Sequence, residues 1–172
     1  NTDAELDVHL MTTNPSDWIE MCAEAGATYI SPHAETINTD AFRTMQMIQK
    51  LGCKCGVVLN PATPLSYVES YLEYIDMLTI MTVDIGFAGQ KFIDQMYEKI
   101  RLAKQLRDEK GYHYKIQIDG HCNKENYRQL VEAGADVLIV GNAGLFGLDK
   151  DLDTACHKMM TEYDTCMLDK AV

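Results

Sequence analysis

Short apolar runs alternate regularly with amphipathic stretches along almost the whole chain of 172 residues. The alternation predicts strands at Leu6–Met11, Thr28–Pro32, Lys54–Leu59, Met77–Val83, Tyr114–Asp119 and Val137–Val140. It predicts helices at Pro15–Ala25, Asp40–Leu51, Leu65–Tyr74, Phe92–Lys110, Lys124–Ala133 and Asp153–Tyr163. Strict alternation with short connections implies a parallel sheet covered by helices. We expect residues 1–172 to form a single domain, because no linker or low-complexity segment interrupts the pattern.

This alternation suits either an open, doubly wound sheet or part of an eight-stranded barrel. The first predicted strand lacks the glycine-rich dinucleotide fingerprint of an open sheet. Polar residues and glycines instead follow the strands, at His9, His33, Asn60, Asp84–Gly89, Asp119–His121 and Gly141–Asn142. A TIM barrel carries its active site at the carboxyl ends of its strands, so the sequence favours an α/β barrel. For His33 and Asn60, an ordinary junction between strand and loop is a sufficient explanation.

The charge balance limits the possible partners. Lys and Arg number 15 against 26 Asp and Glu, a formal charge of −11, which argues against nucleic acid or an anionic membrane. The apolar stretches are of strand length, so no membrane span is expected. The six cysteines are scattered, and no second Cys or His pair stands at ligand spacing beside Cys53 and Cys55. We therefore expect reduced thiols in a cytoplasmic protein.

Three glycine turns, each directly after a predicted strand, form the clearest candidate binding site. Glycine lets the backbone turn sharply and present N–H groups to an anion, and barrels commonly bind phosphate at such loops. Backbone amides carry no net charge, so an acidic protein can still hold phosphate in this way. Three ordinary turns remain the alternative. The turns are Gly86-Phe87-Ala88-Gly89, Gly120-His121 and Gly141-Asn142-Ala143.

His9 and Asp119 form a second candidate constellation. Strand alternation places Asp7, His9 and Met11 on one face of the first strand. It also allows Asp119, at the end of the fifth strand, to converge with His9 at the mouth of a barrel. Imidazole and carboxylate together suit a divalent cation, although two ligands are too few for a closed site. The alternative is that His9 and Asp119 have purely structural roles.

Several phrases of the chain stand in the order of a known enzyme family. They are Asp7-Val8-His9-Leu10-Met11, Asn60-Pro61-Ala62-Thr63-Pro64, Met81-Thr82-Val83-Asp84 leading into Gly86–Gln90, Asp119-Gly120 and Val140-Gly141. From about Leu6 to about Tyr163 the chain therefore resembles the ribulose-phosphate 3-epimerase family. Three further phrases resemble its branch that acts on D-allulose 6-phosphate: His33–Asn38, Asp119–Asn123 and Gly144–Phe146. The resemblance implies a (β/α)8 TIM barrel of the ribulose-phosphate-binding type, here covering roughly strands three to eight and N-terminally incomplete.

The resemblance also implies an isomerase that epimerises a ketose phosphate at C3, converting D-allulose 6-phosphate to D-fructose 6-phosphate. Two carboxylates would transfer protons through an enediolate, which a divalent metal ion (Zn, Mn, Co, Fe or Mg) would stabilise. His9 would bind the metal and lie against the substrate, and Asp119 would be both metal ligand and catalytic acid. The three glycine turns would form the phosphate cradle. Met11 and Met81 would be wall residues of the pocket, for which core packing is the alternative.

Three residues depart from the family pattern. Ile85 stands where the family usually has proline, which should loosen the phosphate loop. His121 and Asn142 replace smaller residues. Backbone donation to phosphate can survive both changes, whereas a hydroxyl contact at position 142 cannot. The side chain of His121 would either donate to phosphate or lie in solvent.

The largest departure concerns the strands that precede the one with His9. In the family they carry a His-x-Asp pair that supplies two metal ligands and the second catalytic carboxylate, and we find no such pair before His9. We therefore expect the isolated chain to be inactive and its sheet edges to favour a homo-oligomer. The alternatives are a ribulose-5-phosphate 3-epimerase and an inactive fragment or sugar-phosphate-binding barrel. Related decarboxylases and hexulose-phosphate synthases carry an Asp-x-Lys-x-x-Asp strand, whereas here the phrase is Asp7-Val8-His9.

Overall fold

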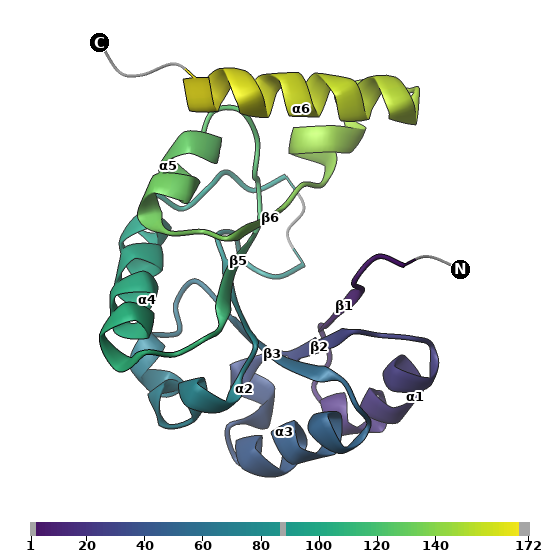
Figure 1. Cartoon of the computed structure of the whole chain (residues 1–172), viewed down its shortest axis with the longest axis vertical. Coiled ribbons are helices and arrows are strands. Elements are labelled where there is room, and N and C mark those ends of the chain that lie inside the picture. Colours follow the sequence, from purple (N-terminus) through teal and green to yellow (C-terminus); the bar gives the residue numbers. More distant parts are fainter. Residues whose placement is uncertain (1–2, 87–88, 169–172) are drawn as a thin grey trace.

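The computed structural model describes residues 3–86 and 89–168. Six parallel strands form one sheet in which each strand pairs with its neighbours in sequence, from β1 to β6. Figure 1 shows this sheet curled, with helices along its outer side. The curled parallel sheet is an α/β half-barrel, which confirms the predicted fold class. The strands are β1 Asp7–Leu10, β2 Tyr29–Pro32, β3 Lys54–Leu59, β4 Met77–Met81, β5 Lys115–Asp119 and β6 Val137–Ile139.

The helices occupy most of the predicted stretches. They are α1 Ile19–Glu24, α2 Ala34–Ile37, α3 Ala41–Lys50, α4 Met96–Lys110, α5 Tyr127–Ala133 and α6 Leu152–Leu168. A single 3₁₀ turn, Pro15–Asp17, precedes α1, and a π-helical turn, Asn142–Phe146, follows β6. None of the described helices is both long enough and apolar enough to cross a membrane.

Several predicted helices differ from the observed ones, and in two of them tertiary contacts prevail over the local pattern. The stretch Leu65–Tyr74 forms two 3₁₀ helices, in which the N–H of Tyr71 donates to the Val68 carbonyl at 3.0 Å. Burial of Val68 and Tyr71 in the core holds this tighter winding. Helix α4 begins at Met96 rather than Phe92, because the Ile93 N–H donates to the Thr82 carbonyl at 3.0 Å and ties that segment to the end of β4.

The hydrophobic core lies between the sheet and its helices. Strands β2 and β4 are buried along their whole length, and Ile30, Leu78 and Ile116 are fully buried within the same apolar cluster as Tyr114. All six cysteines are free, which agrees with the predicted reduced thiols.

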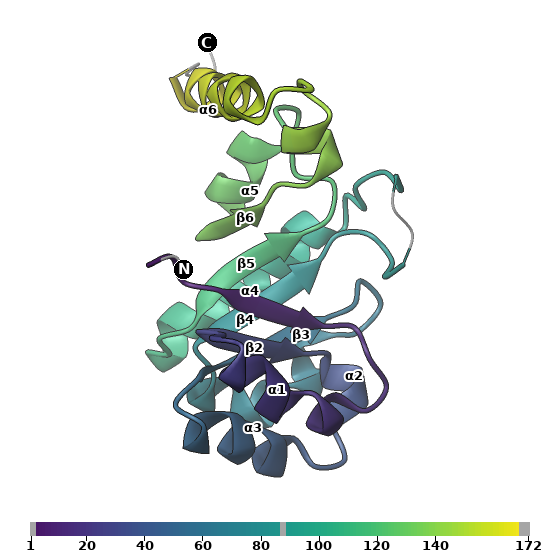
Figure 2. The same cartoon turned by 90° about the vertical axis from the view of Figure 1, so that its right-hand side faces the viewer.

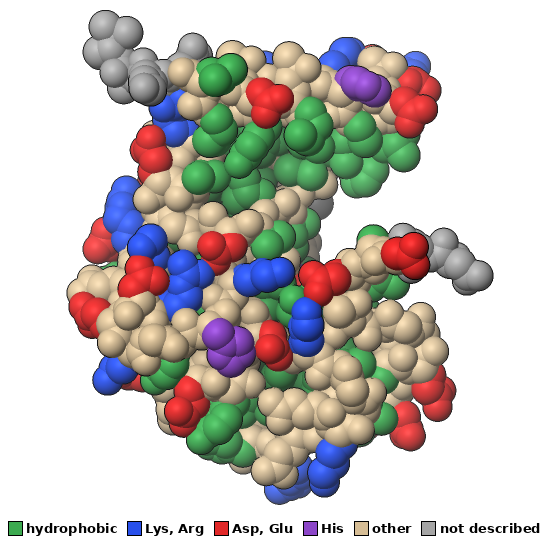
Figure 3. All heavy atoms as spheres, viewed as in Figure 1, with side chains coloured by type: hydrophobic (Ala, Val, Ile, Leu, Met, Phe, Trp, Pro, Cys, Tyr) green, Lys and Arg blue, Asp and Glu red, His purple; other side chains and the backbone are tan. Residues whose placement is uncertain are grey.

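The two edges of the sheet lie at β1 and β6. Among the described residues, β1 pairs only with β2 and β6 pairs only with β5, so each has one unpaired edge. Strand β6 is only partly buried, and in the segments that follow it Phe146, Leu152 and Met160 are exposed. Figure 3 shows hydrophobic side chains gathered on the open side of the molecule beneath α6.

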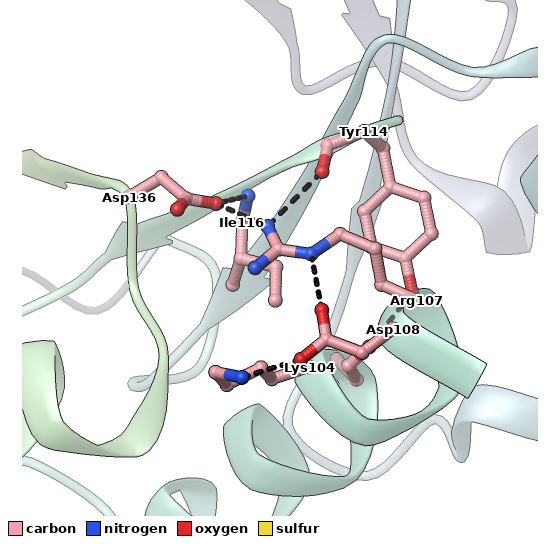
Figure 4. A network of polar contacts seen from close by, with 7 residues as sticks. Lys104, Arg107, Asp108, Tyr114, Ile116 and Asp136 are labelled. Carbon is pink, nitrogen blue, oxygen red and sulfur yellow. Dashed lines mark hydrogen bonds and ion pairs between the residues drawn. The ribbon is translucent and has the colours of Figure 1, made fainter. Parts of the chain in front are cut away.

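Carboxylates tie the amino ends of neighbouring strands together. Asp76, before β4, accepts the backbone N–H of Cys55 at 2.8 Å, and Asp136, before β6, accepts that of Ile116 at 2.8 Å. Arg107 from α4 then donates to Asp136 and, at 3.2 Å, to the Tyr114 carbonyl (Figure 4). Arg107 therefore joins α4, β5 and the start of β6 through one guanidinium group.

Replacing Arg107 by alanine should lower the free energy of unfolding by about 1–2 kcal/mol, because the carbonyl of the buried Tyr114 loses its side-chain donor and the exposed Asp136 carboxylate keeps only the Ile116 N–H. Urea denaturation measures this loss. Arg101 provides the control, since its ion pair with Glu98 is exposed on both sides and its replacement should change stability by less than about 0.5 kcal/mol. Equal losses in the two variants would contradict the structural role of Arg107.

Candidate active site

The strands run in one direction, so their carboxyl ends and the following loops lie on the same side of the sheet (Figure 2). A cavity of about 560 Å³ opens there. Its walls come from the segments that follow β1, β4, β5 and β6. The lining residues are Met11, Met81, Val83, Asp84, Ile85, Gly86, Gly89, Gln90, Asp119, Gly120, His121, Cys122, Ile139, Gly141, Asn142 and Ala143.

All three glycine turns identified in the sequence contribute to this one cavity. Met11 and Met81 also line it, together with Asp119. Phe87 and Ala88, which belong to the first turn, lie outside the described residues. Neither lysine nor arginine lines the cavity among the described residues, so donors to an anion would come from the backbone and from neutral polar side chains such as His121 and Asn142.

The second turn is held close to the end of β4. Gly120 has φ +124°, and a Cβ added there would come within 2.7 Å of the Thr82 hydroxyl oxygen, so only glycine fits this approach. The Thr82 hydroxyl donates to the Gly120 carbonyl. His121 follows with φ +52°, an unusual conformation for a residue with a side chain. The side-chain amides of Asn123 and Asn126 hold it by donating to its carbonyl at 3.1 and 2.9 Å.

The third turn opens the π-helical segment Asn142–Phe146. The carbonyl of Gly141 accepts the N–H groups of Leu145 and Phe146, at 2.9 and 3.2 Å, so the turn winds back onto its own start. Gly144 is buried, and a Cβ there would overlap the Cys122 carbonyl oxygen. The residues that directly follow the second and third turns, Cys122 and Gly144, are therefore in close contact.

His9 and Asp119 lie together, as the strand alternation suggested. Nδ1 of His9 is 3.2 Å from Oδ2 of Asp119, and both side chains are largely buried. Below them Asp7 accepts hydrogen bonds from the Ser31 hydroxyl and the Gln117 side-chain amide, each at 2.6 Å. Because Asp7 is occupied in this way, it serves to brace the inner face of the sheet.

His33, for which the sequence suggested only an ordinary loop position, belongs to the same cluster. It follows β2, is 2% exposed, and places Nε2 at 2.8 Å from Nε2 of His9. The signal that was available is positional: His33 follows the strand next to β1 and is followed by Glu35 two residues later. Its backbone is fixed too, because the Thr36 N–H and hydroxyl both donate to its carbonyl.

Glu35 completes this cluster on the side away from Asp119. Its carboxylate accepts the Asn60 N–H at 3.0 Å and the Thr63 hydroxyl, and its other oxygen lies 3.4 Å from Nδ1 of His33. Burial alone would raise the pKa of Glu35, but the contacts with His33, Thr63 and Asn60 outweigh it and bring the pKa down to about 2. Glu35 is therefore a carboxylate at neutral pH.

A second partly buried charge, that of Lys99, supports the loop that Glu35 contacts. The ammonium group of Lys99 donates to the carbonyls of Asn60, Pro61 and Thr63, at 3.0, 2.7 and 2.7 Å. Burial lowers the pKa of Lys99. Asn60, like His33, thus has more than an ordinary loop position, since this loop carries the donors that anchor Glu35.

His9 and Asp119 fit two positions of a divalent metal shell. An imidazole nitrogen and a carboxylate oxygen, 3.2 Å apart on one wall of the barrel interior, form the nitrogen-and-oxygen donor set that such ions accept. Among residues 3–86 and 89–168, no group of three or more His, Cys, Asp or Glu is arranged to hold a metal ion. The described residues thus supply part of a shell.

Comparison with known proteins identifies a match over most of the chain. The profile of the "Ribulose-phosphate 3 epimerase family" matches residues 1–146. The chain is 44% identical over 154 residues to "Ribulose-phosphate 3-epimerase" of Aquifex aeolicus (strain VF5), which covers 90% of this chain and 68% of that protein. It is 45% identical to the protein of the same name from Bacillus subtilis (strain 168), covering 83% of this chain and 65% of that protein. The chain thus spans about two thirds of these relatives.

Solved structures show the same fold at low sequence identity. The crystal structure of "KGPDC from Streptococcus mutans" superposes with a TM-score of 0.72 at 12% identity, covering 95% of this chain and 74% of that one. "3-Hexulose-6-phosphate synthase from Salmonella typhimurium" superposes with a TM-score of 0.68 at 20% identity, covering 94% and 74%. The half-barrel is therefore a known arrangement of these strands.

Proposed function

The chain belongs to the ribulose-phosphate 3-epimerase family. From this we propose that it carries part of the active site of a metal-dependent isomerase that inverts C3 of a ketose phosphate. The first candidate reaction converts D-allulose 6-phosphate to D-fructose 6-phosphate. One observation carries the proposal: Asp119 and three glycine turns line one cavity at the carboxyl ends of β4, β5 and β6. A sugar phosphate needs both a phosphate cradle and a base beside its reacting carbon, and this cavity offers both.

In this proposal Asp119 acts on the hydrogen of C3. The neighbouring C2 ketone acidifies that hydrogen, so a carboxylate within hydrogen-bond reach removes it and leaves an enediolate. A second carboxylate on the opposite face of the sugar returns a proton and so inverts C3. A divalent ion, when bound, supplies Lewis-acid stabilisation of the enediolate. His9 lies beside Asp119, with its Nδ1 3.2 Å from Oδ2 of Asp119.

The phosphate end of the substrate would lie against the glycine turns. Backbone amides near Gly86, Gly120 and Gly141 add no charge, which suits a protein with a formal charge of −11. Met11 and Met81 form an apolar wall of the cavity that Asp119 also lines. His121, already held in a left-handed conformation, can add a side-chain donor.

D-Ribulose 5-phosphate is the second candidate substrate. It is favoured by the printed names of the relatives from Aquifex aeolicus, Bacillus subtilis and Arabidopsis thaliana, each a ribulose-phosphate 3-epimerase. The two candidates share the chemistry at C2 and C3 and differ by one carbon between C3 and the phosphate. Dissociation constants for the two sugar phosphates, measured side by side by calorimetry, decide between them.

Proton exchange in D₂O tests the proposed chemistry on the chain itself. With Zn²⁺ present, Asp119 should introduce deuterium at C3 of whichever epimer presents its C3 hydrogen to that face, as followed by proton NMR. The other epimer should not exchange, and no epimerisation should occur, because one carboxylate cannot invert a carbon. D-Fructose, which has no phosphate, is the control and should exchange far more slowly. Absence of exchange in every sugar phosphate would contradict the function.

Three further proposals follow for the protein as a whole. We expect the 172-residue chain alone to be inactive in epimerisation, since the residues that we assign supply one carboxylate where two are needed. We also propose a homo-oligomer, supported by the open edges of β1 and β6 and the exposed apolar side chains beneath α6. The six free cysteines support a cytoplasmic location.

A further inference from the structure

A line of four side chains joins Asp119 to the outside of the cavity. It runs from Asp119 to His9, from His9 to His33, and from His33 to Glu35, with atom separations of 3.2, 2.8 and 3.4 Å. The two imidazole rings are tilted by 31° with centroids 4.9 Å apart. Each hydrogen bond needs one donor and one acceptor, so the hydrogens on the two imidazole rings can be assigned in turn from the Glu35 end.

Glu35 sets that direction, because a carboxylate only accepts hydrogen bonds. One of its oxygens is occupied by the Asn60 N–H and the Thr63 hydroxyl. The other oxygen and Nδ1 of His33 are both buried, and neither has another hydrogen-bond partner among the described residues. Two buried polar atoms at 3.4 Å avoid the cost of isolation by pairing, so Nδ1 of His33 carries the hydrogen.

The remaining bonds follow from the two rings. A neutral imidazole that donates from Nδ1 accepts at Nε2, so the close contact between the two rings requires His9 to donate from its Nε2. Nδ1 of His9 then has a free lone pair, and that lone pair faces Oδ2 of Asp119. Two acceptors that face each other at this distance are unfavourable alone and favourable with a cation between them.

We infer that Glu35 acts through His33 as a positioning pair that holds His9 in the Nε2–H tautomer, presenting the Nδ1 lone pair toward Asp119 for a divalent cation. This inference rests on the proposed function for the use of the cation, but the tautomer itself does not. Outer partners of this kind fix the tautomer and ring orientation of histidine ligands in other metal sites.

Glu35→Gln is the informative substitution, because it retains the shape of the side chain but places a hydrogen-bond donor where the carboxylate oxygen accepted from His33. Its amide oxygen must accept the Asn60 N–H, which turns the NH₂ group toward His33. His33 would then accept at Nδ1, donate from Nε2 to His9, and leave His9 protonated at Nδ1. Thr63→Val is the matched control, since it removes a bond to the other Glu35 oxygen and leaves the His33 contact intact.

Long-range ¹⁵N–¹H NMR of the metal-free chain reads these tautomers directly. In the unsubstituted chain and in Thr63→Val, Nδ1 of His9 should give the signal of an unprotonated nitrogen and Nε2 that of a protonated one. In Glu35→Gln the two signals should exchange. A protonated Nδ1 on His9 in the unsubstituted chain would overturn the inference, whatever the substituted chains do.

Titration with Zn²⁺ separates this inference from the proposed function. The Nδ1 signal of His9 should move on addition of Zn²⁺ to the unsubstituted chain, and Glu35→Gln should need about 10–100-fold more Zn²⁺ for the same change. If the tautomer is as inferred but Zn²⁺ leaves Nδ1 unmoved, the metal role in the proposed function fails and the tautomer stands. Equal Zn²⁺ affinity in Glu35→Gln would overturn the positioning role.

Discussion

Replacing Asp119 by asparagine should slow deuterium exchange at C3 of the bound ketose phosphate by about 10²–10⁴-fold, the usual contribution of a positioned acid–base group. The amide cannot take up the C3 proton, while it keeps the size of the side chain and its place beside His9. Binding of the sugar phosphate itself should change little, because the phosphate is held by backbone amides of the glycine turns. Exchange rates from proton NMR and dissociation constants from calorimetry measure the two effects separately.

Asp84 supplies the control for this substitution. It is a carboxylate lining the same cavity, but it is exposed and pairs with Gln90, whose side-chain amide donates to it at 3.1 Å. Asp84→Asn should leave the exchange rate within a few-fold of the unsubstituted chain. If instead Asp84→Asn abolished exchange and Asp119→Asn did not, the base would be on the β4 side of the cavity and the assignment of Asp119 would be wrong.

Replacing Gly144 by alanine should cost about 2–3 kcal/mol of the free energy of unfolding. The added methyl group would overlap the Cys122 carbonyl oxygen and stand 2.8 Å from the Tyr127 hydroxyl, so the backbone itself must move. Any such movement separates the residues that directly follow the second and third glycine turns, which meet at this point. Binding of inorganic phosphate should therefore weaken by about tenfold or more, as measured by calorimetry alongside urea denaturation.

Gly141→Ala is the stability control for this prediction. A methyl group at Gly141 meets no atom within 4 Å, and this residue is exposed. Its effect on unfolding should stay below about 0.5 kcal/mol. A similar loss of stability in both variants would show that the loss does not depend on the close approach of Gly144 to Cys122.

The strands could be predicted almost to the residue, because each is an apolar run bounded by polar or glycine residues. The run Lys54–Leu59 matches β3 at both ends, and β6 differs from its prediction by one residue. Gly111 and Gly134 also end α4 and α5 in the left-handed conformation expected of such glycines. In these places local preference and tertiary packing favour the same structure.

The short helices could not be predicted from the pattern. Helix α2 has four residues, fewer than the window over which helical periodicity can be recognised. The 3₁₀ winding of Glu69–Tyr74 depends on where Tyr71 finds its partner, since its hydroxyl donates to Asn38 at 3.0 Å from a segment distant in sequence. Contacts of this kind exist only after the chain has folded.

The candidate site divides in the same way. His9, Asp119 and the glycine turns could be named because each residue type suits its chemistry and follows a strand. Glu35 and Lys99 could not, because their importance lies in partners such as Asn60 and Thr63 that are contributed by another loop. A residue whose role is to position another residue is therefore harder to predict from a single sequence than a residue that contacts the substrate.

Arg107, Asp136 and Asp76 fasten the strands at their amino ends, whereas the cavity opens at their carboxyl ends. The length of the barrel wall therefore separates the bonds that stabilise the sheet from the groups assigned to substrate. Substitutions at the two ends of the strands should have additive effects on the free energy of unfolding, because no side chain is shared between the two ends. The loops at the carboxyl ends can therefore change in sequence, and so in the ligand that they accept, while the contacts at the amino ends keep the strands in register.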